Sequence, residues 1–388
     1  MKHQIYILLL CIGSLWGCRD PFNPPEIQNF NELIVIEANV NGTTGEASVV
    51  LSISKPLDSE DATLYISGAD VYLQSEAGAN YYLTFQGDGK YIASNVYLDY
   101  GDEIQLYVAV GNRQYMSEYE EFIKTPEIDS VTFNADTDGV QVFVSTHDLE
   151  NQTLYYKWDY FETWIFSAAF TSSFVYDTYP NGDLILSSIS GRSRSQIDSM
   201  QFCFKDHAST QIILGTSENL SQDIISENEL LFSSHAEGKF KYRYSVLVKQ
   251  NALTKRSYDY WSLLRSNTED LGSIFDKQPS NFDSNIRNIS SPDEGVLGYF
   301  SVFSETQKRI FIDAADVPEH ETSETLSDLC TAELLAYFDP IIGYSPLSAE
   351  INSRYIVTVY DSSGLVSSPI CCDCRFTGYY ETPDFWEE

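Results

Sequence analysis

The cysteines are the residues whose type and spacing could support disulfide or metal chemistry. Besides Cys11 and Cys18 near the start, five cysteines lie far along the chain: Cys203, Cys330, Cys371, Cys372 and Cys374. The last three resemble a metal-binding segment, but no histidine is near them, and zinc would need a fourth ligand from a distant segment. Five thiols form at most two disulfides, and the sequence alone does not decide which cysteines pair. We predict disulfides among these five cysteines and no metal site.

Cys18 could do a different chemistry, because it directly follows Leu15-Trp16-Gly17. One positive charge, Lys2, precedes an apolar run from Ile5 to Trp16, which is too short to span a bilayer and is typical of a secretory signal. Leu at −3, Gly at −1 and Cys at +1 match the bacterial lipobox, in which the thiol is acylated and the peptide is cut before it. The alternative is a plain secretory signal with a chance cysteine. We predict that residues 1–17 are a lipoprotein signal peptide and that Cys18 carries palmitate-type acyl chains.

Residues of other catalytic types do not form motifs. The histidines are isolated in the sequence, and no zinc-protease motif, serine elbow, phosphate loop or dinucleotide fingerprint is present. Asp136-Thr137-Asp138-Gly139 resembles the start of a calcium loop, but its twelfth position is His147 rather than Glu, so a hairpin turn explains it better. We therefore predict a protein that is not an enzyme and needs no cofactor.

The charge of the chain excludes one class of partner. The sequence has 57 acidic and 23 basic residues, a net charge of −34, and cleavage that removes Lys2 would make it −35 (−34 − 1). Such a chain repels nucleic acid and anionic headgroups, so we expect no nucleic-acid partner. No long Asp/Glu run is present, and solubility explains the acidity.

Aromatic residues make up 14% of the chain, with 27 tyrosines and 22 phenylalanines. Tyr and Phe favour strands, so these residues first indicate a β-rich protein. A tyrosine-studded recognition surface is the second interpretation.

The first part of the mature chain predicts an antiparallel sandwich. Residues 18–30 contain three prolines and predict an extended tether. Alternating apolar residues follow at intervals near ten residues, for example at 34–40, 49–53, 69–73 and 104–110, with turn residues between them. We predict an immunoglobulin-like β-sandwich over residues 31–126.

The remainder, residues 127–388, predicts a larger β-rich domain. The aromatic run Tyr155 to Trp164 indicates a central strand packed on both faces, whereas residues 165–200 predict long loops or a short hairpin. One long helix is expected at about 252–267, with Asn251 as its N-cap and Trp261 packing against the second sheet. The tail with its cysteines is expected to lie back on this domain.

Short stretches along the mature chain together resemble a family of Bacteroidota outer-membrane lipoproteins, catalogued as domain of unknown function 4249. The stretches that carry the resemblance are Leu33 to Glu37, Gly68 to Val71, Tyr155 to Trp164, Arg243 to Val248, Tyr258 to Trp261, Gly272 to Asp276, Pro279, Asn285-Ile286, Gly298 to Ser301, Lys308 to Phe311, Cys372 to Arg375 and Pro383 to Trp386.

This resemblance implies a lipid-anchored protein of the outer membrane that faces the cell exterior and works beside a TonB-dependent transporter, a nutrient-importing β-barrel. It implies no catalytic residues. A structural or assembly factor of outer-membrane biogenesis is the alternative function, and a surface hydrolase with a site built across the fold is a third. Loss of one nutrient's uptake on depletion would favour the first, general envelope failure the second, and a deep cleft with paired carboxylates the third.

Overall fold

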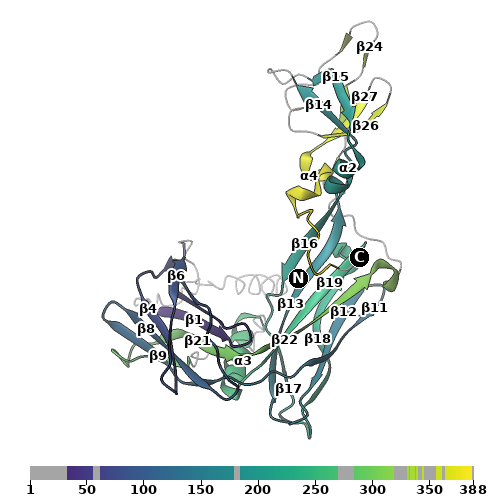
Figure 1. The fold of residues 1–388 in the computed structure, drawn as a ribbon. Helices are drawn as coiled ribbons and strands as arrows, with labels where there is room; N and C mark the ends of the chain where they lie inside the picture. Colours follow the sequence, from purple (N-terminus) through teal and green to yellow (C-terminus); the bar gives the residue numbers. More distant parts are fainter. Residues whose placement is uncertain are drawn as a thin grey trace, which may run out of the picture.

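The structure is a computed structural model that describes residues 33–55, 62–178, 184–269, 284–318, 330–331, 333–336, 338–339, 343–344, 355–360 and 363–386. The predicted signal peptide, Cys18 and the tether lie outside the described residues. The described chain is mainly β, as predicted, and its strands form several sheets (Figure 1). Within this part of the chain, no helix is long and apolar enough to cross a membrane.

Two sheets pack face to face in the N-terminal sandwich. One has the order β21-β1-β2-β7-β6, with β3 paired to β2, and the other has the order β20-β9-β8-β4-β5, with β10 paired to β8. The strand bounds are β1 (Ile34–Asn41), β2 (Glu46–Ile53), β3 (Leu64–Tyr65), β4 (Asp70–Ser75), β5 (Asn80–Tyr82), β6 (Thr84–Gly87), β7 (Lys90–Ala93), β8 (Glu103–Val110), β9 (Arg113–Ser117), β10 (Glu120–Glu121), β20 (Ile286–Asn288) and β21 (Val296–Phe303).

The alternation of residues along these strands builds the sandwich core. One buried cluster contains Ile36 of β1, Leu51 of β2, Leu73 of β4 and Leu106 of β8, each fully buried. The neighbours of these residues along each strand point to the opposite face of the sheet. Burial of each such core side chain is worth roughly 1.5–3 kcal/mol. The core confirms the predicted sandwich, with one pair of strands, β1 and β21, running parallel.

The predicted division at residue 126 does not describe this sandwich fully. Strand β21 pairs with β1 from Val296 to Phe303, and strand β20 pairs with β9. Both strands come from the range assigned to the second domain, so the chain returns to the first sandwich after α3. Strand pairing between segments this far apart in the sequence leaves no trace in local periodicity, which is why the sequence missed it.

The second unit is also two packed sheets, with the orders β11-β12-β18 and β16-β13-β19-β22, and β17 pairs with β13. Its strands are β11 (Ile128–Ala135), β12 (Gly139–His147), β13 (Tyr155–Ser167), β16 (Phe202–Ala208), β17 (Ile213–Thr216), β18 (Ile224–Ser234), β19 (Arg243–Ala252) and β22 (Glu305–Asp313), and the short helices η1 (His235–Glu237) and η2 (Ala314–Asp316) follow β18 and β22.

As predicted, the aromatic run lies in a central strand. Trp158 is fully buried and donates its indole N–H to Gln250 Oε1 at 2.8 Å.

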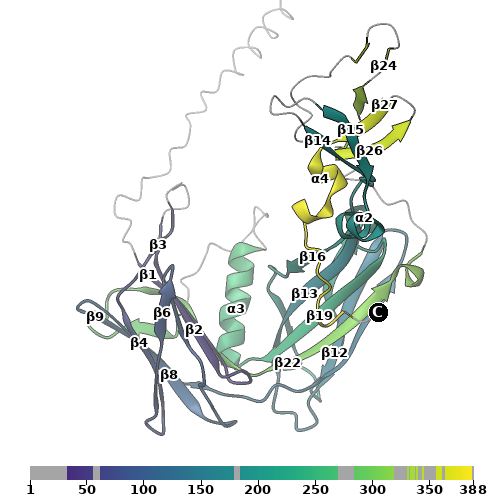
Figure 2. The ribbon, with the colours of Figure 1, turned by 45° about the horizontal axis from the view of Figure 1, so that its top comes forward.

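The helix α3 (Lys255–Thr268) confirms the predicted long helix, but its N-cap is Thr254, not Asn251. Strand β19 continues to Ala252, and Asn251 still pairs there with both neighbouring strands. Sheet pairing therefore outcompetes helix initiation at this residue. Figure 2 shows α3 standing between the sandwich and the second unit.

A small third group of strands lies beyond the far end of β13 and β16 (Figure 1). Its sheet has the order β15-β14-β26-β27-β23, with bounds β14 (Phe174–Thr178), β15 (Leu184–Gly191), β23 (Glu333–Ala336), β26 (Tyr355–Tyr360) and β27 (Ser363–Ser367), and a separate pair joins β24 (Phe338–Asp339) and β25 (Gly343–Tyr344). The predicted hairpin is β14–β15, but the sequence missed helix α2 (Arg194–Gln201), which is capped by Ser193. The helices α4 (Pro369–Cys372) and η4 (Cys374–Phe376) lead into the tail.

Candidate functional site

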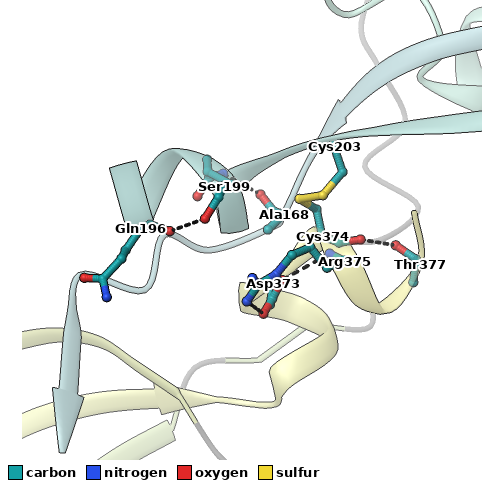
Figure 3. The surroundings of a disulfide bond; sticks show 9 residues. Ala168, Gln196, Ser199, Cys203, Asp373, Cys374, Arg375 and Thr377 are labelled. Carbon is teal, nitrogen blue, oxygen red and sulfur yellow. Dashed lines mark hydrogen bonds and ion pairs between the residues drawn. A yellow bond between two sulfur atoms is a disulfide. The ribbon is translucent and has the colours of Figure 1, made fainter. Parts of the chain in front are cut away.

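Four of the five late cysteines form two disulfides at the junction between the second unit and the far strands. Cys203 of β16 bonds to Cys374 of η4, and Cys330 bonds to Cys371 of α4. Cys372, which lies between Cys371 and Cys374 in the sequence, has a free and buried thiol. The Cys203–Cys374 bond therefore fixes the tail to the end of the long sheet (Figure 3).

Polar contacts order the segment around this disulfide. The buried carboxylate of Asp373 accepts two bonds from the Arg375 guanidinium, at 2.8 and 2.7 Å, and such bidentate pairs are strong (Figure 3). Downstream, Phe204 and Tyr379 exchange backbone hydrogen bonds of 2.7 and 3.0 Å. Trp386 then packs edge-on against Phe204. The tail lies back on the second unit, as the sequence predicted.

The free thiol of Cys372 is chemically quiet. Burial raises its pKa to about 11, so the thiol is almost entirely protonated near neutral pH. Within the described residues, no group of three or more His, Cys, Asp or Glu side chains could hold a metal ion. The geometry gives these cysteines a structural role.

A groove of about 670 Å³ lies where the sandwich meets the start of α3. Clefts between domains are common binding sites in proteins. This one combines acidic, basic and aromatic side chains, namely Glu103, Tyr119, Glu120, Glu121, Thr254, Lys255, Arg256, Asp259, Tyr260 and Leu263.

Glu120 is the most deeply placed carboxylate of this groove, with 4% of its surface exposed. Its Oε1 accepts from Asn285 Nδ2 at 2.8 Å and from the Tyr299 hydroxyl at 2.9 Å. Thr254, the cap of α3, donates its hydroxyl to Oε2 at 3.4 Å. Burial raises the pKa of Glu120, and these donors oppose that shift. A carboxylate surrounded by donors in this way links the cap of α3 to the sandwich.

Helix α3 joins the two units through opposite faces. On one face, Tyr260 stacks on Tyr299 of the sandwich with ring centroids 4.5 Å apart, and Arg256 pairs with Glu118. On the other, Trp261 packs against the cluster that contains Tyr155 of β13. The predicted packing of Trp261 on the second sheet is confirmed. The groove is therefore built from the sandwich and from the helix that joins it to the second unit.

A second buried carboxylate, Glu162 of β13, lies inside the second unit with 1% of its surface exposed. Its Oε1 accepts from Lys239 Nζ and from the Tyr244 hydroxyl, each at 2.8 Å, and His207 Nδ1 lies 2.8 Å from Oε2. Burial, followed by the charge of Glu162, raises the pKa of Tyr244 well above its usual range, so the phenol stays protonated and donates. Three partners compensate the buried charge.

His147 lines a second groove, of about 760 Å³, beside the segments that connect the two units. Its Nδ1 lies 2.7 Å from Asp129 Oδ2, and this hydrogen bond raises the pKa of His147. At the other end of the β11–β12 hairpin, Asp136 Oδ1 accepts from the backbone N–H groups of Asp138 and Gly139. These bonds lower the pKa of Asp136 and form the hairpin turn that the sequence predicted in preference to a calcium loop.

The sequence analysis did not identify Glu120 or Glu162 as functional candidates, although the strand pattern around Glu162 contains a signal. Glu162 occupies an inward position of an alternating aromatic strand, between Tyr160 and Trp164, where a charge requires a buried partner. Glu120 lies in a two-residue strand with no pattern. Its partners come from residues 254, 285 and 299, which only the fold brings together.

Comparison with known proteins yields a family but no function. No curated protein matches this chain. Among solved structures, the chain is similar to a crystal structure of a mutant Salmonella alpha-2-macroglobulin, at 9% identity, over 82% of this chain and 16% of that one, with a TM-score of 0.17. That TM-score is too low to carry an argument. A family model described as "Domain of unknown function (DUF4249)" matches residues 19–309. This match spans most of the chain, and the chain therefore belongs to the DUF4249 family.

Proposed function

We propose that this chain is a lipoprotein of a Bacteroidota outer membrane, anchored through an acylated Cys18 on the extracellular side, and that it is a non-catalytic partner of a TonB-dependent transporter. The observation that carries the proposal is the Leu15-Trp16-Gly17-Cys18 sequence at the end of a twelve-residue apolar run (residues 5–16). The two disulfides support export, because disulfides persist in oxidising compartments.

The position of the anchor limits where the body can act. Ile34, the first residue of β1, follows Cys18 by sixteen positions (34 − 18). Even a fully extended segment of that length reaches only about 55 Å. The N-terminal sandwich would therefore stay close to the membrane surface. The net charge of −34 would hold the body away from anionic headgroups and favour a protein surface as its docking site.

The way the two units are joined supports a role in binding. Helix α3 contacts both units, and the carboxylate of Glu120 links the cap of α3 to the sandwich. A preorganised body loses little entropy when it docks on a partner. The groove beside Glu120 lies at this junction.

Two experiments test the proposal. Mass spectrometry of the purified protein should find Cys18 as the first residue with acyl chains attached, and the Cys18→Ser variant should lose membrane attachment. Cross-linking in cells followed by detergent extraction should recover one large β-barrel with the wild-type protein. An unacylated N-terminus, or recovery of the lipoprotein alone, would contradict the proposal.

Depletion separates the proposed role from the assembly-factor alternative. A transporter partner predicts loss of uptake of one nutrient with an otherwise intact envelope. General failure of outer-membrane assembly would favour a factor of the biogenesis machinery instead.

A further inference from the structure

One face of the N-terminal sandwich carries tyrosines that cross the sheet from strand to strand. Tyr82 of β5 lies opposite Tyr72 of β4, and Tyr72 lies opposite Tyr107 of β8. Ring centroids are 5.6 Å apart for Tyr72 and Tyr82 and 4.6 Å apart for Tyr72 and Tyr107. The same row continues to Met116 of β9 and to Arg287 of β20 at the sheet edge. The three rings therefore form a strip with one ring per strand.

This strip faces outward. Val71 and Leu73 flank Tyr72 in the sequence and are buried in the sandwich core, so strand alternation directs Tyr72 to the opposite face. Tyr82 is 72% exposed. Figure 2 shows β4 and β8 in the sandwich and α3 beside it, and Glu103 at the start of β8 lines the groove beside α3. Tyr72, Tyr82 and Tyr107 are not among the residues that line this groove.

Amide side chains form the next row on the same face. Gln74 lies opposite Asn80 on one side and Gln105 on the other. Gln105 Nε2 donates to Gln74 Oε1 at 3.1 Å, which orients both amides. Gln105 is largely buried and orients Gln74, whereas Gln74 is half-buried and Asn80 is exposed, so these two amides present the accessible donors and acceptors of the row. We call Tyr72, Tyr82, Tyr107, Asn80, Gln74 and Gln105 the tyrosine platform.

The platform is uncharged although the chain has a net charge of −34. Charged side chains border it, among them Asp70, Glu103 with Glu121 opposite it, and Arg287. An anionic ligand would meet the repulsive field of the whole molecule, which also disfavours nucleic acid as the stacking partner. A neutral ligand approaches without that cost. The field therefore disfavours an anion, and a cation would find no carboxylate among the six platform side chains, so the platform suits an uncharged occupant.

We propose that the tyrosine platform binds a neutral glycan. A pyranose ring presents weakly positive C–H groups on its faces and hydroxyl groups on its edges. The C–H groups match the negative faces of tyrosine rings, and the hydroxyl groups match oriented amides. Binding sites commonly combine aromatic surface with a few fixed polar groups in this way. The proposal does not depend on acylation of Cys18 or on a transporter.

Affinity electrophoresis tests the proposal with the full-length protein in a detergent that contains no sugar. The gels contain neutral polysaccharides, namely amylopectin, glucomannan, xyloglucan and arabinan, or the anionic polygalacturonate. At least one neutral polysaccharide should slow the protein, and polygalacturonate should not. Tyr82→Ala should weaken that binding about 10-fold, because loss of one well-placed aromatic contact has about that effect.

Two further variants separate binding from folding. Tyr82→Phe keeps the ring and should retain binding. Tyr97→Ala is the matched control, because Tyr97 is 73% exposed, close to the 72% of Tyr82, and lies outside the platform. The proposal is overturned if no neutral polysaccharide slows the protein or if Tyr82→Ala binds as the wild type does. A protein partner that is lost with Tyr82→Ala, without any polysaccharide binding, would overturn it as well.

Discussion

Hydrogen bonds between Thr125 and Ser304 join two of the segments that connect the sandwich to the second unit. The backbone N–H of Thr125 donates to Ser304 Oγ at 2.6 Å, and the Thr125 hydroxyl donates to the Ser304 carbonyl at 2.7 Å. Both residues are nearly inaccessible to solvent. Thr125 lies between β10 and β11, and Ser304 lies between β21 and β22. This pair therefore helps to fix the relative placement of the two units, together with the contacts of α3.

Ser304→Ala should destabilise the protein by about 1–3 kcal/mol, because it leaves the buried N–H of Thr125 without its acceptor. Calorimetric unfolding of the two proteins measures the difference. Ser221→Ala is the control, since Ser221 is exposed in a loop and should change stability little. Equal loss in both variants would show that the junction is not important for stability.

Lys239→Met should cost about 3–5 kcal/mol, because the buried carboxylate of Glu162 would lose its cation. Methionine keeps most of the apolar stem, so the loss reports on the charge. Lys241→Met, two residues away and exposed, serves as the control in the same denaturant titration. If the two variants unfold at the same denaturant concentration, the Glu162 pair contributes nothing.

Removal of Cys203–Cys374 should destabilise the protein more than removal of Cys330–Cys371. The bridges span 171 and 41 residues, for which the chain-entropy model gives about 5 and about 4 kcal/mol. The test compares thermal unfolding of Cys203→Ser/Cys374→Ser with that of Cys330→Ser/Cys371→Ser. The opposite order would mean that local strain or structure in the unfolded chain outweighs loop entropy.

Cys372 should resist alkylation in the folded protein. Burial raises its thiol pKa to about 11. At pH 8 only about one thiol in a thousand would then be ionised, and the thiolate is the reactive form. Mass spectrometry after iodoacetamide treatment should find Cys372 unmodified in native protein and modified once after denaturation without reductant. Rapid labelling of the native protein would contradict this prediction.

His147 should titrate above the usual histidine range, because Asp129 accepts a hydrogen bond from its imidazolium. A raised folded-state pKa favours the protonated form. Its small stabilisation is therefore fully present below the ordinary pKa and is lost as the pH rises through the folded pKa. An NMR titration of the His147 ring should show the pKa falling in Asp129→Asn. Asp148→Asn should lower it less, since Asp148 acts on His147 through charge alone.

Local pattern predicted the strands and the long helix. Alternation placed Val71 and Leu73 on the core face, and the aromatic density of β13 indicated its central position. The predicted N-cap of α3, Asn251, lies three residues before the observed one, Thr254. Strand β19 extends to Ala252, further than the alternation of apolar residues in the sequence indicated. Segment 165–200 was too weakly periodic to reveal α2. Local propensity loses to tertiary pairing at such boundaries.

The sequence by itself determined the β-rich class, the acidic surface, the Cys18 motif and the supply of cysteines, because these depend on composition and near neighbours. Only the tertiary structure decided which cysteines pair, that β20 and β21 complete the first sandwich, and which side chains surround Glu120. It also decided that Tyr72, Tyr82 and Tyr107 share one face in register. Each of these joins residues far apart in the chain, and strand register and long-range pairing are properties of the packed whole.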